Sequence, residues 1–297
     1  MLLRLIGYGF RKLFHRCITL RHGGQTLACN TLRNPPNSRE TNVTVIVPTR
    51  DKHQLLRVML ESLERTAPFA DVIIVDNQSV ELETLKYLKG MSTKTNYRVL
   101  KYDAKFNYAK ICNMAAREAK TEFIVFANND LVFSAPGWLE NMLNHLEQTD
   151  VGLVGSILRY EDGRTQHAGI VMHHLGLANH YKEESFSDSV TQKSCPVVSG
   201  VTFALVALRS RTFSLLNGLD EEFGVGLNDV DFCLRMREVG MKIVCCAGNS
   251  VLHLESQSRD SMFSVSGFLR AFQEIALFYK KHGTKATRED FFIRSSR

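Results

Sequence analysis

Short apolar segments alternate with helical segments between residues 43 and 127, and no other feature of the sequence constrains the fold as much. These segments are apolar throughout and not only at every second position, which is typical of strands buried on both faces of a parallel sheet. We expect strands at 43–47, 72–75, 98–102 and 123–127, and helices at 54–66, 81–89 and 107–120. The sequence therefore predicts an α/β fold, with a mostly parallel central sheet, helices on both faces and right-handed crossovers.

Polar residues follow three of these strands: Thr49 and Arg50, then Asp76, then 128–130. Carboxyl ends of parallel strands share one edge of a sheet, where such folds bind ligands. Asp76 is placed to contact a nucleoside. Asp130, beside two asparagines, can hold a hard divalent cation through oxygen. The sequence has no glycine-rich dinucleotide motif and no P-loop motif, so a cation at Asp130 is the expected partner for a nucleotide's phosphates.

The second half of the chain has a different pattern. Asp162-Gly163 is a turn signal that predicts a hairpin into 165–172. The polar segment 173–195 is expected to form a mobile loop over the site. Further elements are expected as strands at 151–158, 197–206 and 241–246, and as helices at 138–148, 211–216, 229–239 and 262–282. Within the strand at 197–206, Gly200 leaves room for a ligand to approach closely.

Composition narrows the class of protein. With 297 residues, 44% hydrophobic and 23% charged, the chain has the composition of a globular protein. The seven cysteines form no C-x-x-C pair, which indicates reduced thiols in a cytosolic protein and neither a disulfide framework nor a zinc site. No stretch approaches the roughly 20 apolar residues that span a bilayer. A net charge of +6 is too small to indicate a nucleic-acid partner.

Residues 1–22 combine apolar residues at helical spacing with five arginines and lysines and no acid. Two interpretations stay open: a helix on an anionic membrane surface, or a helix packed on the protein's own core. Charged residues interrupt the apolar runs, which argues against a signal peptide, whereas an organellar presequence also fits the composition. Residues 30–42, with a Pro-Pro pair, are predicted to be a linker.

Seven short stretches occur in the order found in one enzyme family. They are Val45-Ile-Val-Pro-Thr-Arg50, Val75-Asp-Asn-Gln-Ser79, Phe106-Asn-Tyr-Ala-Lys-Ile-Cys-Asn113, Phe126-Ala-Asn-Asn-Asp130, Asp162-Gly-Arg-Thr-Gln-His-Ala-Gly169, Asn228-Asp-Val-Asp-Phe-Cys-Leu-Arg235 and Leu252-His-Leu-Glu-Ser256. Each stretch is a weak signal, but together and in order they are a strong one. From roughly residue 43 to 260 the chain resembles glycosyltransferase family 2, in particular its bacterial rhamnosyl- and galactosyltransferase-like branch of surface polysaccharide synthesis.

The resemblance implies a GT-A fold, with a Rossmann-like nucleotide-binding half and an acceptor-binding half. It also implies a nucleotide-diphospho-sugar donor, UDP- or dTDP-linked, and a divalent cation, Mn or Mg. On the donor side, Pro48, Thr49 and Arg50 correspond to residues that line the nucleobase pocket. Asp76 corresponds to the residue that bonds the base, and Asn107 to another nucleoside contact.

The residues for metal binding and catalysis are also implied by the resemblance. Asn128, Asn129 and Asp130 occupy the position of the family's D-x-D motif, with Asn128 in place of its first acid. His253 corresponds to a histidine that completes the metal shell in some relatives; the alternative for it is a core-edge histidine bonded to a backbone carbonyl. Asp229 corresponds to the catalytic base. Independently of the resemblance, acids in the first turn of a helix are explained by the helix dipole, and we adopt that explanation for Asp231.

The expected activity is that of an inverting, metal-dependent hexosyltransferase acting on a hydroxyl of a glycan or lipid-linked glycan in cell-envelope polysaccharide synthesis. We expect a cytoplasmic protein, free or peripheral at the inner face of the membrane. The expected organisation is a basic segment at 1–40, the GT-A domain at 41–260, and a helix with a basic tail at 261–297. The alternatives are a non-catalytic nucleotide-sugar-binding scaffold and a nucleotide-dependent methyltransferase or dehydrogenase.

Overall fold

The computed structural model describes residues 26–28, 42–172, 178–180, 194–247, 251–254 and 265–283. The predicted helix at 1–22, almost all of the predicted linker at 30–42 and most of the predicted loop at 173–195 lie outside the described residues. Among the helices that are described, none is both long and apolar enough to cross a membrane.

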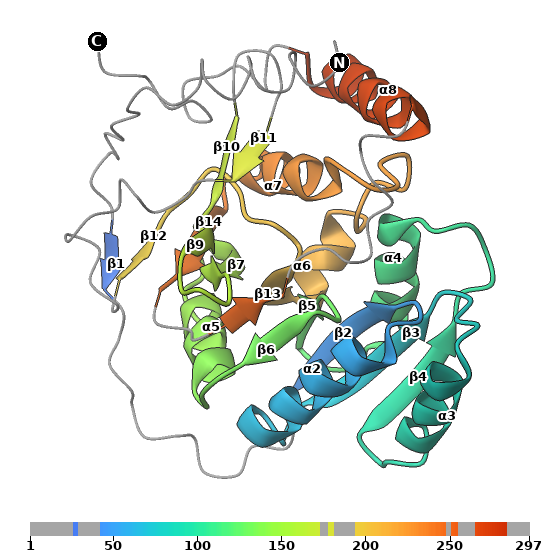
Figure 1. Cartoon of the computed structure of the whole chain (residues 1–297). Helices are drawn as coiled ribbons and strands as arrows, with labels where there is room; N and C mark the ends of the chain where they lie inside the picture. Colours follow the sequence, from blue (N-terminus) through green and yellow to red (C-terminus); the bar gives the residue numbers. More distant parts are fainter. Residues whose placement is uncertain are drawn as a thin grey trace.

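A seven-stranded sheet forms the centre of the described structure, with the strand order β14-β7-β13-β5-β2-β3-β4 (Figure 1). Its strands are β2 (Val43–Thr49), β3 (Asp71–Asp76), β4 (Tyr97–Lys101), β5 (Phe123–Ala127), β7 (Val151–Ser156), β13 (Leu205–Arg209) and β14 (Lys242–Cys246). All neighbouring pairs are parallel except the two that involve β13, which runs antiparallel to both β5 and β7. The predicted α/β fold with a mostly parallel sheet is confirmed.

Helices cover both faces of this sheet, which explains why its strands are apolar throughout. In β2, Val45 and Val47 belong to one buried cluster and Ile46 to the other. One face is covered by α2 (His53–Thr66), α3 (Leu82–Met91) and α5 (Trp138–Leu146). The other face is covered by α4 (Tyr108–Glu118), α6 (Ser210–Leu215) and α7 (Asn228–Glu238). A further helix, α8 (Val265–His282), packs against α7 through Phe278.

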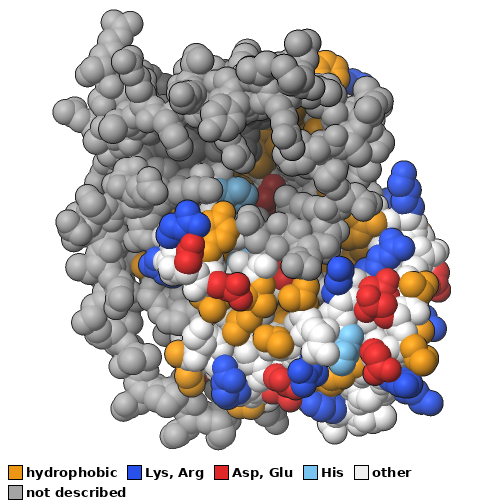
Figure 2. All heavy atoms as spheres, viewed as in Figure 1, with side chains coloured by type: hydrophobic (Ala, Val, Ile, Leu, Met, Phe, Trp, Pro, Cys, Tyr) orange, Lys and Arg blue, Asp and Glu red, His pale blue; other side chains and the backbone are white. Residues whose placement is uncertain are grey.

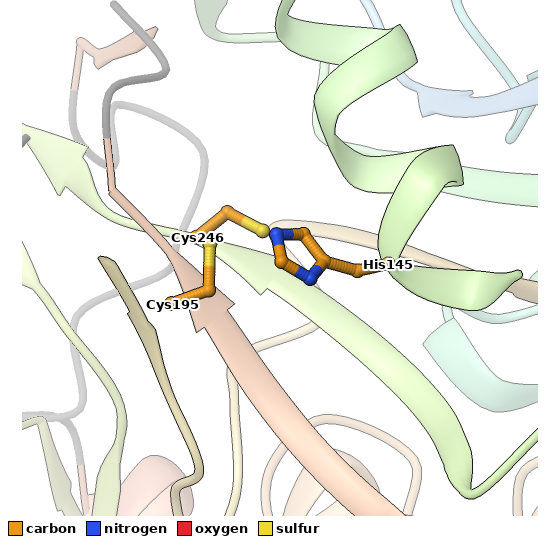
Figure 3. A group of neighbouring side chains, drawn as sticks. All are labelled: His145, Cys195 and Cys246. Carbon is orange, nitrogen blue, oxygen red and sulfur yellow. The ribbon is translucent and has the colours of Figure 1, made fainter. Parts of the chain in front are cut away.

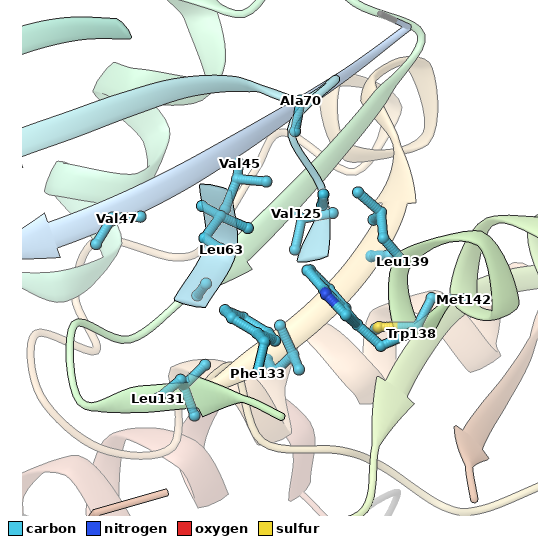
Figure 4. Packing of buried hydrophobic residues seen from close by; sticks show 14 of the residues in the cluster. Val45, Val47, Leu63, Ala70, Val125, Leu131, Phe133, Trp138, Leu139 and Met142 are labelled. Carbon is cyan, nitrogen blue, oxygen red and sulfur yellow. The ribbon is translucent and has the colours of Figure 1, made fainter. Parts of the chain in front are cut away.

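The first of these clusters is centred on aromatic residues from neighbouring elements (Figure 4). Phe133, in strand β6 (Leu131–Phe133), stacks on Trp138 with the ring centroids 4.1 Å apart. The Trp138 Nε1–H donates to Thr66 Oγ1 at 3.1 Å, so the one polar atom of this buried indole has a partner. This packing fixes β6, and with it the turn that carries residues 128–130, against α2.

Three smaller sheets complete the fold. The four-stranded one has the order β6-β15-β8-β9, with β8 (Leu158–Arg159), β9 (Thr165–His167) and β15 (Val251–His253). The other two pair β10 (Ile170–Met172) with β11 (Ala178–His180), and β1 (Thr26–Ala28) with β12 (Ser194–Pro196). The hairpin predicted around Asp162-Gly163 is present as β8–β9. It stops at His167, because Gly169 has a positive φ and the chain turns into a different sheet.

Two expectations for this half of the chain were wrong. The strand predicted at 197–206 begins only at Leu205, because residues 198–204 form an irregular connection that leads into the first residue of β13. The part of 173–195 that is described is not loop but strand, since β11 pairs with β10 and Ser194 begins β12.

Candidate active site

The strands β5, β2 and β3 are adjacent and parallel, so their carboxyl ends bring the predicted polar residues to one edge. Thr49 lies opposite Asp76 in the register of β2 and β3. Asn129 reaches across from the end of β5, and its Nδ2 donates to Thr49 Oγ1 at 3.0 Å. Thr49 and Asp76 are buried, Asn128 and Asn129 are half-buried, and the structure thus places all four at the same end of the sheet.

The loops after β2 and β3 are tied to each other at this edge. The carboxylate of Asp51 accepts the backbone N–H of Val80 at 2.7 Å and of Glu81 at 2.8 Å. In return, Ser79 Oγ accepts the N–H of Asp51 at 2.7 Å. Asp51 and Gln78 both have positive φ, which non-glycine residues adopt only where their surroundings hold them there. The sequence analysis gave Asp51 no role, because its partners come from a loop that only the fold brings near.

The predicted nucleoside contacts differ in how available they are. Arg50 is exposed and Pro48 is half-buried, so both can line a pocket. Asp76 uses Oδ1 to accept the N–H of Ser79 at 3.0 Å. Asn107 caps α4, with Oδ1 accepting from Lys110 N at 2.9 Å, and its Nδ2 donates to Glu221 O at 2.9 Å. Both polar atoms of the Asn107 side chain are therefore engaged within the protein.

The fold brings Asp130 and His253 into direct contact, although they are far apart in the sequence. Asp130 precedes β6 and His253 ends β15, and these two strands pair antiparallel with His253 opposite Leu131. His253 Nε2 lies 3.1 Å from Asp130 Oδ1, and both side chains are largely buried, 14% and 6% exposed. In the space-filling view, Lys and Arg side chains are interspersed with Asp, Glu and hydrophobic ones over the described part of this face (Figure 2).

Gln166 determines which nitrogen of His253 carries the proton. Gln166 Oε1 lies 2.6 Å from His253 Nδ1, and because this oxygen only accepts, Nδ1 must be the donor. A neutral His253 ring then presents the lone pair of Nε2 to the Asp130 carboxylate, and two acceptors 3.1 Å apart repel unless a positive charge is shared between them. A proton on the ring, or a cation bound by both, supplies that charge.

The geometry of this pair fits a divalent cation. Two ligands in adjacent positions of an octahedral ion, each at about 2.1 Å, are about 3 Å apart. The Asp130 oxygen and the His253 nitrogen already have this separation. A second partner that fixes the ring of a metal-binding histidine is a common feature of metal sites, and Gln166 is in that position.

His167, next to Gln166, connects β9 to Thr202 and to His180 through both of its ring nitrogens. Its Nε2 accepts the N–H of Thr202 at 3.3 Å, so its Nδ1 carries the proton and donates to His180 Nδ1 at 2.8 Å. Burial, and then the nearby His180 and His253, hold the pKa of His167 well below its ordinary value. His167 therefore stays neutral and links β11 to the segment 198–204.

Asp229 is the second residue of α7 and is half-buried, with its Oδ1 accepting the N–H of Val230 at 2.8 Å. Asp229 and Cys233 are four residues apart on one face of the helix. Cys233 contacts the segment that leads into β13, since its sulfur lies 3.4 Å from Val201 N. Gly200 is also close to Cys233, which a Cβ on Gly200 would meet at 3.2 Å. The group that approaches Gly200 closely is therefore Cys233 of α7. The sequence had suggested that a ligand would approach this glycine.

The loop before α7 is held at the same edge of the sheet. Gly224 O accepts the N–H of Tyr108 at the start of α4, at 2.8 Å. From the other side, the Glu274 carboxylate of α8 accepts the N–H of Val225 and of Gly226, each at 3.1 Å. Both α4 and α8 therefore position the residues that lead to Asp229.

Asp231 does more than interact with the helix dipole, which was the explanation adopted from the sequence. Its carboxylate is 2% exposed and lies between the side chains of Arg235 and His282. Arg235 Nη2 is 2.7 Å from Oδ2, and His282 Nε2 donates to Oδ1 at 2.8 Å. Arg235 also donates to the carbonyl oxygens of Leu216 and Gly218. Asp231 thus joins α7, α8 and the 216–218 turn.

Known proteins are similar to this chain in sequence or in fold. The family model described as "Glycosyl transferase family 2" matches residues 44–206. Over 225 residues the chain is 36% identical to the O-antigen biosynthesis protein RfbC of Myxococcus xanthus, a match that covers 73% of this chain and 18% of that protein. The chain thus spans about a fifth of the length of this relative.

Solved structures with low sequence identity share the fold. GalNAc-T7, in a crystal structure with UDP, GalNAc and Mn2+, aligns with a TM-score of 0.66 at 12% identity, over 82% of this chain and 50% of that one. The mannosyltransferase PcManGT of Pyrobaculum calidifontis, in complex with GDP-Man and Mn2+, aligns with a TM-score of 0.57 at 18% identity, over 94% of this chain and 70% of that one.

Proposed function

This chain belongs to glycosyltransferase family 2 and has the GT-A fold, and from this premise we propose that it transfers a sugar from a UDP- or dTDP-linked donor to a hydroxyl of a glycan or lipid-linked glycan, with inversion at the anomeric carbon. Family membership decides against the methyltransferase and dehydrogenase alternatives. The observation that carries the proposal is the contact between Asp130 and the Gln166-held ring of His253, at the edge where Thr49 and Asp76 end their strands.

In the proposed mechanism each group has one task. Asp76, with Pro48, Thr49 and Arg50, holds the nucleoside. Asp130 and His253 would hold Mn or Mg, which would supply Lewis-acid stabilisation of the negative charge on a departing diphosphate. The Asp229 carboxylate takes the proton of the acceptor hydroxyl as its oxygen attacks the anomeric carbon. Attack from the face opposite the diphosphate inverts that carbon.

Asn128 and Asn129 have a supporting part in this proposal. Asn129 fixes Thr49 through its side-chain amide, so it couples the nucleoside pocket to the turn that carries Asp130. Asn128, at the first position of the motif, offers a neutral oxygen where the usual D-x-D motif has an acid. One carboxylate and one imidazole give modest affinity alone, so we expect the cation to bind together with the donor's phosphates. Asn107 acts through the loop at Glu221, which leads toward Asp229.

The acceptor and the place of action follow from the same proposal. The segment 157–172, which contains Gln166 and pairs with β15 through Arg159, lies beside His253, and we assign acceptor recognition to it. A lipid-linked acceptor would lie at a membrane surface, and the basic segment 1–22 would hold the enzyme at the inner face through anionic lipids. We place the transferase domain at 41–260 and the appended segments at 1–40 and 261–297.

A thermal-shift panel tests donor binding. UDP, dTDP and GDP are each added with and without Mn, and a nucleotide at 100 times its Kd stabilises the native state by about 2.7 kcal/mol, or roughly 5–10 °C in Tm. We expect UDP or dTDP to give the larger shift, and Asp130→Ala to lose the part that depends on Mn. The absence of any nucleotide shift would contradict the proposal. A shift without release of nucleotide diphosphate from any sugar donor would point to the scaffold alternative.

A second prediction concerns Gln166. Gln166→Leu removes the acceptor that fixes the His253 ring, and we expect about 10- to 100-fold weaker binding of Mn in the presence of UDP, measured by calorimetry. Gln166→Glu keeps an acceptor opposite Nδ1 and should restore most of the affinity. Gln273→Leu, at an exposed position of α8, is the matched control and should have no effect. Equal Mn affinity in Gln166→Leu and Gln273→Leu would show that His253 is not a ligand.

A further inference from the structure

Three buried side chains outside the proposed transfer site meet beside the edge strand of the central sheet. His145 comes from α5, Cys195 from β12 and Cys246 from β14 (Figure 3). Their candidate ligand atoms, one imidazole nitrogen and two sulfurs, all lie within 4.8 Å of one another. Figure 3 shows a ring nitrogen of His145 pointing toward the sulfur of Cys246.

The separations are close to those of a metal site. Zinc binds thiolate sulfur at about 2.3 Å and imidazole nitrogen at about 2.0–2.1 Å in a tetrahedron, which places neighbouring ligand atoms about 3.5–3.8 Å apart. Ligand atoms within 4.8 Å therefore need to move together by about 1 Å at most. Rotation of two cysteine side chains about χ1 can supply such a movement.

The cluster does not behave like ordinary core packing. His145 is 3% exposed, and its Nδ1 has no hydrogen-bond partner within the described part of the chain, although buried polar atoms are nearly always paired. The pKa values of the buried thiols also set this cluster apart. Burial raises the pKa of Cys112, Cys233 and Cys245, as it does for inert thiols. Cys195 differs from these thiols, because the hydrogen bond with Cys246, followed by the interaction with His145, lowers its pKa despite burial.

We propose that His145, Cys195 and Cys246 bind a soft divalent transition-metal ion, zinc first among them, at a site separate from the transferase centre. On binding, each thiol releases its proton to solvent and forms a sulfur–metal bond, and the two thiolates neutralise the ion's double positive charge. A neutral complex is the form that a buried site can hold at low cost. A solvent molecule takes the fourth tetrahedral position.

The site would fasten the edge of the fold. β14 is the last strand of the central sheet, and β12 carries the short strand β1 through the pairing of Cys195 with Leu27. A metal ion bound by all three residues would join β14, β12 and α5, which are distant in the sequence. The ligands lie too far apart for any C-x-x-C pattern, which is why the cysteine spacing predicted no zinc site.

Cobalt titration of the full chain tests the proposal. Cobalt held by two thiolates in a tetrahedron gives a sulfur-to-metal charge-transfer band and strong ligand-field bands, whereas a carboxylate–imidazole site such as Asp130 and His253 gives neither. We expect these bands at one equivalent of cobalt in the chelator-treated, reduced protein, and loss of the bands in Cys246→Ala and Cys195→Ala. Cys245→Ala is the matched control, since Cys245 neighbours Cys246 in β14 but lies in the cluster on the opposite face, and it should keep them.

The change in Tm on adding zinc is a second test, and it remains informative if one of these variants folds poorly. In an Asp130→Ala background, which removes the other candidate site, saturating zinc should raise Tm by roughly 5–10 °C. The rise should persist in Cys245→Ala and disappear in His145→Gln, whose circular dichroism without metal reports whether it is folded. A protein without the charge-transfer band, or equal bands in Cys246→Ala and Cys245→Ala, would overturn the proposal.

Discussion

Asp229→Asn should lower the rate of sugar transfer about 100- to 10,000-fold and leave donor binding unchanged. An acceptor hydroxyl is a very weak acid, and the amide cannot take its proton as the new bond forms. Asp229 is half-buried in the first turn of α7, one helical turn before Cys233, whose sulfur lies 3.4 Å from Val201 N. The near-isosteric amide preserves this packing, so the loss should appear in kcat and not in the Kd for UDP.

The measurement is nucleotide-diphosphate release with acceptor under saturating donor, together with calorimetric binding of UDP. Asp150→Asn is the matched control: Asp150 is exposed and precedes the amino end of β7, at the opposite edge of the sheet from the site. It should retain the full rate. Wild-type turnover in Asp229→Asn would refute the assignment of the base, while a loss of UDP binding would show that Asp229 belongs to the donor pocket.

Asp231→Ala should lower the free energy of unfolding by about 3 kcal/mol, at the lower end of what breaking a buried ion pair costs. Removing the carboxylate leaves His282, 8% exposed, without its acceptor and Arg235 without its counter-charge. Arg235 is 23% exposed and keeps two carbonyl partners, which limits the cost. A smaller loss of activity should follow, because α7 carries Asp229 and α8 holds the loop before it.

Urea unfolding of Asp231→Ala and Asp150→Asn measures this effect under matched conditions. Asp150 pairs with Lys242 at the surface, and breaking this exposed pair should leave the midpoint unchanged. If the two variants had the same midpoint, Asp231 would be no more than a helix-dipole partner, as the sequence alone suggested.

The sequence predicts the sheet better than the connections, and the reason is physical. Strands such as Phe123–Ala127 are buried on both faces, so their apolar runs are visible in the sequence and end where the structure ends them. The run at 197–206 is equally apolar, but Val197 makes only an isolated bridge to Val244 and the middle of the run packs against α7, and only tertiary contacts decide between these outcomes and a continuous strand. Turn residues allowed the β8–β9 hairpin to be predicted, but they do not reveal which sheet β10 joins.

Some residues of the candidate site can be predicted from the sequence and others cannot, for a similar reason. Strand ends predict that Thr49, Asp76 and Asp130 meet, because parallel strands must end at one edge. His253 and Asp229 required the resemblance, since their place depends on how β15 and α7 return to that edge. The hydrogen bond between Gln166 and His253, and the meeting of His145 with Cys195 and Cys246, have no local signal, since each is created by elements far apart along the chain.

The antiparallel direction of β13 has a consequence for how such enzymes can diversify. Because β13 runs antiparallel to β7, β7 ends and β13 begins at the same edge, and the chain can return to this edge without a crossover of the βαβ kind. A parallel strand in this position would need a crossover packed on the core. Within this connection the turn at 161–164 is exposed, so a change of length there should cost little more than loop entropy and leave the strands of the central sheet intact.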